Sequence, residues 1–132
     1  MKFRYLKTEG MHQPVIPVTL FKDGVHTATE ALVDSGANAS IFHAEYAEDL
    51  GLTLTDGDPV SFIGIVGPPL RAYRHELTVE IGGNRFDLPI AFSADMSIDG
   101  FNILGQLDFF ALFPIKFTFE KKEIHLMSPL HT

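Results

Sequence analysis

The chain of 132 residues contains no cysteine and no tryptophan. Without cysteine, disulfide bonds, thiolate chemistry and cysteine-ligated zinc are excluded. No apolar run approaches the ~20 residues that a membrane-spanning helix needs, so no membrane partner is expected. Met1–Lys7 carries basic residues but no apolar stretch follows it, so we expect no signal peptide, and a cytoplasmic location is the default expectation.

The sequence also lacks any cluster of positive charge. The formal net charge is −7, and the ten lysines and arginines are scattered along the chain. A nucleic-acid surface needs a basic patch that neutralises phosphates, so no nucleic-acid partner is expected. The short basic run Lys121-Lys122 falls in a predicted turn, where solvation is its expected role.

The composition that remains is typical of a single folded domain, expected to span residues 1–132. The apolar fraction is 45% and the charged fraction is 20%, as in soluble globular proteins. Twelve phenylalanines, with many valines, isoleucines and threonines, favour strands. Because no repeat or linker divides the chain, we expect one mainly β domain.

Apolar runs and alternating patterns predict short strands joined by tight turns. Strands or apolar runs of strand length are expected at 15–21, 25–33, 71–81, 86–92, 101–105, 117–119 and 124–126, with turns at Asp23-Gly24 and Gly82-Gly83. Short helices are expected at 43–51, which ends at Gly51, and at 106–112, before Pro114.

The six histidines show no spacing typical of a zinc site, so no metal and no cofactor are expected. His43 stands at the start of a predicted helix, which favours a surface or capping role. His75 belongs to the predicted strand at 71–81 and is expected to face solvent.

The most informative stretch is Ala31–Ala37, in which three apolar residues run directly into Asp34-Ser35-Gly36. The apolar residues predict the end of a buried strand, and Ser35-Gly36 predicts a sharp turn after it. Taken alone, Asp34 fits an Asx-turn that caps its own backbone. A carboxylate beside a core is costly unless it is paired or hydrogen-bonded, so a catalytic role is the competing interpretation.

Two further elements follow Asp34 in order. Residues 60–69 are apolar but interrupted by two glycines and two prolines, which fits a loop or hairpin tip. Asn102-Ile103-Leu104-Gly105 leads into the predicted second helix, and Gly105 lies 71 positions after Asp34. In this order and at this length, the chain resembles the retropepsin-like aspartic proteases over about residues 14–126, with residues 1–13 unmatched.

The resemblance implies a small closed acid-protease-type β-barrel with one or two short helices and a flap hairpin. Members of this family pair as symmetric homodimers, and each subunit gives one aspartate to a shared cleft. Asp34 would then be the catalytic residue and would meet its counterpart across the two-fold axis. Because the chain has a single Asp-Ser-Gly, dimerisation would be a condition of peptide-bond hydrolysis.

The resemblance also assigns supporting and substrate-binding residues. The active-site loop would be supported by Ser35, Gly36, Ala37, Asn38, Gly105 and Gln106. The flap would be formed by Ile63, Gly64, Ile65, Val66 and Gly67, and would close over a peptide or protein substrate bound in extended conformation. Alternatively, the flap stretch is a proline-rich loop packed on the barrel.

One departure from the family pattern concerns Asn38 and Gln106. Viral members commonly carry an acidic residue and an arginine at these places, and the two pair. We expect the two amides to hydrogen-bond to each other instead. The competing function for the whole chain is a non-catalytic retropepsin-like module that binds peptides or dimerises without cleaving.

Overall fold

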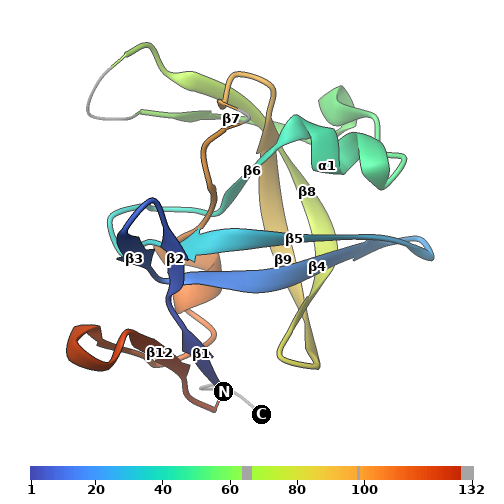
Figure 1. Cartoon of the computed structure of the whole chain (residues 1–132). Helices are drawn as coiled ribbons and strands as arrows, with labels where there is room; N and C mark the ends of the chain where they lie inside the picture. The colour runs from blue at the N-terminus through green and yellow to red at the C-terminus, as the bar shows by residue number, and fades with distance from the viewer. Residues whose placement is uncertain (64–66, 98, 129–132) are drawn as a thin grey trace.

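A seven-stranded sheet that curves round a phenylalanine-rich core dominates the computed structural model, which describes residues 1–63, 67–97 and 99–128 (Figure 1). In spatial order the strands are β4 (Val15–Lys22), β5 (Val25–Val33), β10 (Asn102–Leu104), β6 (Ile41–His43), β9 (Asn84–Ser93), β8 (Leu70–Ile81) and β7 (Asp58–Phe62). A further antiparallel pairing of β4 with β8 makes a closed ring of β4, β5, β10, β6, β9 and β8. The predicted mainly β, barrel-like class is confirmed.

The two long hairpins of this sheet turn where the sequence predicts. Asp23 and Gly24 join β4 to β5 with φ of 49° and 81°, and Gly82 and Gly83 join β8 to β9 with φ of 58° and 81°. Positive φ at both central residues is the requirement of a type I′ turn, whose twist matches that of the flanking strands. These turns therefore fix the register of both hairpins.

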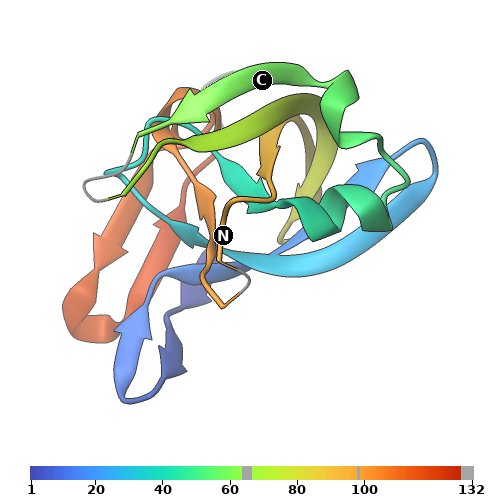
Figure 2. The ribbon, with the colours of Figure 1, turned by 90° about the horizontal axis from the view of Figure 1, so that it is seen from above.

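A second, smaller sheet joins the two ends of the chain and lies to one side of the barrel (Figures 1 and 2). This terminal sheet has the strand order β1 (Lys2–Arg4), β12 (Glu123–Leu126) and β11 (Ile115–Thr118). A short hairpin of β2 (Leu6–Thr8) and β3 (Met11–Gln13) connects it to the barrel. The N-terminal ammonium of Met1 donates to the Leu126 carbonyl at 2.7 Å, which fastens the sheet at its edge.

The helices are short. Helix α1 spans Ala44–Asp49, and the His43 ring accepts a hydrogen bond from the Glu45 N–H at 3.1 Å, which confirms the capping role. Gly51 ends the helix with φ of 74°, as predicted. The second expected helix is a π-helical turn at Gln106–Phe110, and 3-10 turns lie at Leu54–Asp56 and Phe119–Lys121. Among the described residues, no helix is long and apolar enough to cross a bilayer.

The strand at 71–81 shows where the sequence-based expectation fails. Leu77, Val79 and Ile81 are buried as predicted, but His75 belongs to the same face and is half-buried rather than solvent-facing. Its ring packs edge-to-face on Phe92 at 5.9 Å, and its Nε2 lies 2.9 Å from the Leu54 carbonyl oxygen. The alternation of the strand, and not the polarity of the imidazole, thus decides which way the His75 side chain faces.

The phenylalanine core generates a stability prediction. Phe92 is 0% exposed in the main core, whereas Phe119 is 66% exposed. Phe92→Ala should lower the free energy of unfolding by about 3–5 kcal/mol, because it leaves a cavity. Phe119→Ala, the matched control, should lower it by about 1 kcal/mol or less, because it removes little beyond a cation–π contact with Lys122. Urea unfolding followed by circular dichroism measures both; equal effects would contradict this core assignment.

Candidate active site

Asp34 follows the last residue of β5 and lies half-buried where the chain leaves the barrel. Its carboxylate Oδ1 accepts a hydrogen bond from the Gly36 N–H at 2.8 Å, and its carbonyl accepts one from the Ala37 N–H at 3.2 Å. The Asx-turn contact expected from the sequence is therefore present. It leaves Oδ2 of Asp34 free of any hydrogen bond among the described residues, and it holds the carboxylate in one orientation beside the exposed Ser35 and Gly36.

Strand β10 holds the Asp34 loop at its base. The loop connects β5 to β6, and β10 lies between these two strands, parallel to β5 and antiparallel to β6. At the end of this ladder the Asp34 N–H donates to the Leu104 carbonyl at 3.0 Å. The start of the loop is thus fixed by a strand that lies about 70 residues further along the chain.

The residues after β10 continue the contact with the loop. Gln106 N–H donates to the Ala37 carbonyl at 2.9 Å, and Leu107 N–H donates to the Asn38 carbonyl at 2.7 Å. At Gly105 a Cβ would lie 2.5 Å from the Ala39 backbone, closer than real Cβ atoms approach, so a side chain there would force the two segments apart. The structure therefore brings together the supporting residues that the resemblance assigns, namely Ser35, Gly36, Ala37, Asn38, Gly105 and Gln106.

The predicted pair of side-chain amides is wrong. The Gln106 side-chain amide donates to the Ser35 carbonyl, and no side-chain hydrogen bond of Asn38 occurs among the described residues. The physical reason is that backbone bonds already join Asn38 to the residue after Gln106, while the Gln106 side chain is long enough to reach the exposed turn beyond. Gln106 thus contacts the loop, but at another residue.

A buried polar cluster behind the loop was not predicted from the sequence. Ser40 is 1% exposed; its hydroxyl donates to Asp108 Oδ1 at 2.5 Å and accepts from the Gly105 N–H at 3.0 Å. The Ser40 N–H donates to Asp108 Oδ2 at 2.9 Å, and the Phe109 N–H donates to Oδ1 at 2.6 Å. Asp108 therefore joins the end of the loop to the start of the π-helical turn, with both carboxylate oxygens satisfied.

Asn102 forms a second unpredicted junction. It is 6% exposed; its side-chain oxygen accepts from the His43 N–H at 2.9 Å, and its amide donates to the Glu30 carbonyl at 3.0 Å. It therefore ties β10 to both of its neighbours, β5 and β6. A polar residue inside the apolar run at 101–105 is the sequence signal that could have identified it.

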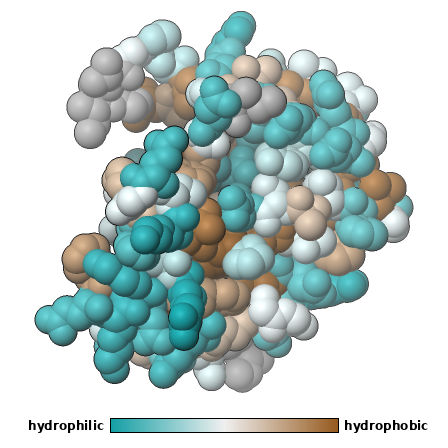
Figure 3. Space-filling view, viewed as in Figure 1, coloured by the Kyte–Doolittle hydropathy of each residue, from teal (hydrophilic) through white to brown (hydrophobic). Residues whose placement is uncertain are grey.

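The predicted flap coincides with the connection between β7 and β8. These strands pair from Asp58↔Arg74 to Phe62↔Leu70, and Figure 3 shows the hairpin arm projecting from the body above an open space. Ile63 is 85% exposed, Pro68 and Pro69 are exposed, and Gly67 has φ of 89°. The assignments of Gly64, Ile65 and Val66 lie outside the described residues.

A small apolar cluster connects the flap arms to the strands β6, β9 and β10. It consists of the buried Ile41, Ala72 and Ala91, with the partly buried Val60, Phe62, Leu70, Met96 and Ile103 packed against them. Ile103 belongs to β10, directly beside the strand that delivers Asp34. The cluster therefore joins the flap arms to the strand that neighbours β5.

One ion pair joins the outer part of the hairpin arm to the segment that follows β9. Arg71 Nε on β8 lies 3.3 Å from Asp95 Oδ2, and the Arg71 N–H donates to the same oxygen at 3.0 Å. The hydrogen bonds from Arg71 lower the pKa of Asp95 below its usual range. The Ser93 hydroxyl also donates to the Arg71 carbonyl at 2.6 Å, so the outer part of β8 is held by the end of β9.

The Ser40–Asp108 cluster makes a second stability prediction. Ser40→Ala should lower the free energy of unfolding by about 1–3 kcal/mol, because it leaves the Gly105 N–H without a partner and removes one of the two hydrogen bonds to Asp108 Oδ1. Ser61→Ala on the exposed part of β7 should change it by no more than about 0.5 kcal/mol. Chemical denaturation measures both, and a Ser40→Ala protein as stable as the Ser61→Ala control would contradict the role of the cluster.

The geometry agrees with the comparisons to known proteins. A family model described as aspartyl protease matches residues 16–107, and no curated protein matches the chain. Among solved structures, the EIAV protease in complex with the inhibitor HBY-793 is similar, with 18% identity, a TM-score of 0.54, and coverage of 76% of this chain and 88% of that one. The family match includes Asp34, the flap arms and Gly105. The chain belongs to the aspartyl protease family and has a retropepsin-like fold.

Proposed function

We propose that this protein is an aspartic endopeptidase that acts as a symmetric homodimer. The observation that carries the proposal is the position of Asp34: a half-buried carboxylate, oriented by Gly36, on a turn that β10 and Gln106 hold in place. The chain has a single Asp-Ser-Gly, so a second catalytic carboxylate has to come from a second copy. An isologous interface places the same residue on both sides of the two-fold axis.

The surface around Asp34 supports pairing. Ser35, Gly36 and Asn38 are exposed on the single protomer, and the neighbouring Leu107 is 77% exposed. A large apolar side chain beside a conformationally fixed polar loop is typical of a surface that a partner covers. In this arrangement Leu107 is buried against the second copy, next to the paired aspartates.

The chemistry follows from two carboxylates about 3 Å apart, which share one proton because both cannot ionise. The ionised member takes a proton from a water molecule as the water oxygen attacks the peptide carbonyl carbon. The protonated member gives its proton to the carbonyl oxygen. As the carbon–nitrogen bond breaks, the leaving nitrogen takes the proton that came from the water, and a hydroxyl of the diol intermediate returns its proton to the other carboxylate as the carbonyl re-forms, so that the pair again holds one shared proton.

The substrate is a peptide segment in extended conformation between the Asp34 loop and the flap. The hairpin arm of β7 and β8 covers it and excludes water. The apolar cluster that includes Val60, Phe62 and Ile103 favours apolar side chains close to the cleaved bond. We expect no metal and no cofactor to take part.

The direct test is cleavage of a mixed peptide library by the wild type and by Asp34→Asn. The substitution keeps the shape of the side chain but removes the shared proton and the base, so the rate should fall by at least about a thousandfold. Asp23→Asn makes the same change at the exposed β4–β5 turn and should leave the rate unaltered. Mass spectrometry of the products gives both the rates and the cleaved bonds.

Two results would overturn the peptidase assignment. Equal cleavage by the wild type and Asp34→Asn would mean that another group is catalytic. Absence of cleavage by the wild type, with peptides still bound, would favour the non-catalytic binding module, which keeps the same cleft without the reaction.

Subunit mixing tests the shared site. When a threefold excess of Asp34→Asn chains is exchanged into the wild type at saturating substrate, random pairing leaves about a quarter of the wild-type chains in intact dimers. The activity per wild-type chain should therefore fall to about a quarter of its starting value. Activity that stays constant would mean that each chain works alone, whatever its oligomeric state in sedimentation.

A further inference from the structure

Positive charge gathers in one part of the molecule, although it is scattered along the sequence. Six of the ten lysines and arginines lie in residues 1–13 and 114–128, with only three of the seventeen acidic residues. These segments contain the terminal sheet and the β2–β3 hairpin, and they carry a formal charge of +3 against −10 for all other residues. Residues that are far apart in the sequence are therefore brought together in the fold, because β1 pairs with β12.

Four of these cations line one hollow. A hollow of about 340 Å³ lies between the start of the chain and the connection from β11 to β12. Arg4, Lys7, Lys121 and Lys122 line it, and Glu123 is the one carboxylate among its lining residues. This basic hollow has a formal charge of +3 in a molecule whose net charge is −7.

None of the four cations is neutralised by an ion pair within the described residues. The two ion pairs found in that part of the chain join Arg71 to Asp95 and Arg85 to Glu80, on the barrel. Lys122 Nζ lies 3.1 Å from the ring centroid of Phe119, which is a contact with an aromatic face and not with a carboxylate. Because the four cations repel one another, an anion in the hollow would be stabilised by all of them.

The walls of the basic hollow also provide hydrogen-bonding side chains other than lysine and arginine. Tyr5 and His12 belong to its lining. Burial raises the pKa of Tyr5, so its hydroxyl stays protonated and can donate. A backbone hydrogen bond of 2.7 Å from the Tyr5 N–H to the Lys122 carbonyl holds the two walls together, so the donors occupy a formed site.

We propose that the basic hollow binds the phosphate groups of a small diphosphate-bearing molecule. Arginine and lysine are the side chains that proteins use for phosphate, and three net positive charges exceed what one carboxylate would neutralise. The volume lies within the range of small-molecule sites. The acidic remainder of the molecule repels a long polyanion, so a compact ligand fits better than a nucleic acid or an acidic protein surface. The proposal does not depend on peptidase activity.

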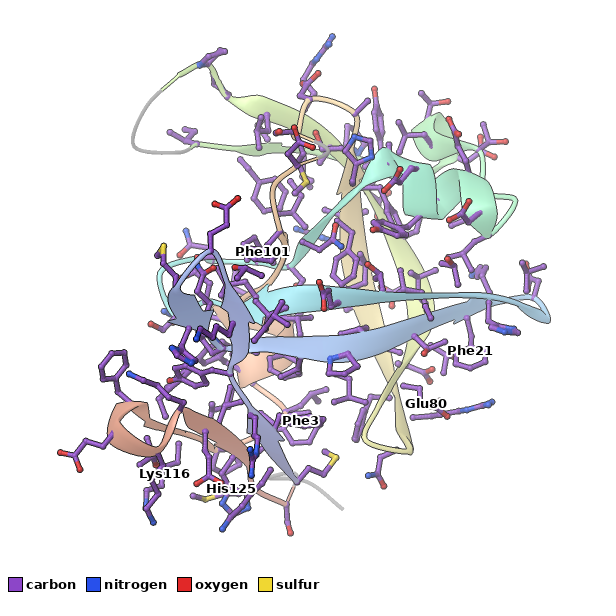
Figure 4. All side chains as sticks on the ribbon, in the orientation of Figure 1. Phe3, Phe21, Glu80, Phe101, Lys116 and His125 are labelled. Carbon is purple, nitrogen blue, oxygen red and sulfur yellow. The ribbon has the colours of Figure 1, made fainter. Side chains whose placement is uncertain are left out.

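The terminal sheet provides a matched control. Lys2 and Lys116 flank His125 across the strands β1, β12 and β11, and Figure 4 places Lys116 and His125 together at the lower edge of this sheet. Both lysines are exposed and neither lines the basic hollow. The double variant Lys2→Gln/Lys116→Gln therefore removes two positive charges from residues 1–13 and 114–128, as Lys7→Gln/Lys121→Gln does. Lys7 and Lys121 are also exposed, so the two double variants differ in whether the lost charges line the basic hollow.

The test is calorimetric titration of the full chain with pyrophosphate in about 0.15 M NaCl. The wild type should show saturable binding at one site per chain. Lys7→Gln/Lys121→Gln should weaken the affinity by about tenfold or more, and Lys2→Gln/Lys116→Gln should change it by less than about twofold. Thermal unfolding of both double variants verifies that they are folded.

Three outcomes would overturn the proposal. The first is the absence of saturable binding by the wild type. The second is an equal loss of pyrophosphate affinity in both double variants, which would mean that the terminal segments attract the anion diffusely and not at one site. The third is equally tight binding of a short oligoglutamate peptide, which would identify carboxylates of an acidic peptide as the ligand instead.

Discussion

The site depends on a short run of hydrogen bonds between two segments that are far apart in sequence. Leu104, Gln106 and Leu107 contact the backbone of the loop from Asp34 to Asn38, and Gly105 is small enough to let them approach. A turn rich in small residues would otherwise have many accessible conformations. These contacts hold the turn in one conformation, so the aspartate has a fixed direction within the single chain.

Buried polar side chains complete this support, and each has its hydrogen-bonding groups satisfied. No buried side-chain nitrogen or oxygen lacks a partner in the described part of the chain. Ser40 and Asn102 are the clearest cases, because both lie in the core and both connect β10, or the residue that follows it, to a neighbouring segment. A polar group in such a place costs stability unless its partners are positioned correctly, so these residues favour one arrangement of the strands over near alternatives.

Much of this arrangement could be predicted from local patterns. Alternation and turn residues predicted the long strands and both type I′ turns, and the apolar run into Asp34 predicted the end of β5. The partners of Ser40, Asp108 and Gln106 could not be predicted, because they depend on which strands become neighbours in the closed sheet. His75 was misassigned for a related reason: its polarity is visible in the sequence, whereas its contacts with the Phe92 ring and the Leu54 carbonyl are not.

The insertion of β10 between β5 and β6 has a consequence for the order of events during synthesis. Most of the chain must leave the ribosome before Asn102–Leu104 can enter the gap and fix the loop that ends at Ser40. Contacts of such large sequence separation form slowly, because the intervening chain must first be ordered. A nascent or truncated chain that ends before residue 102 therefore carries Asp34 on an unsupported turn. The geometry of the Asp34 turn is therefore complete only after the last strand of the barrel, β10, has entered the sheet.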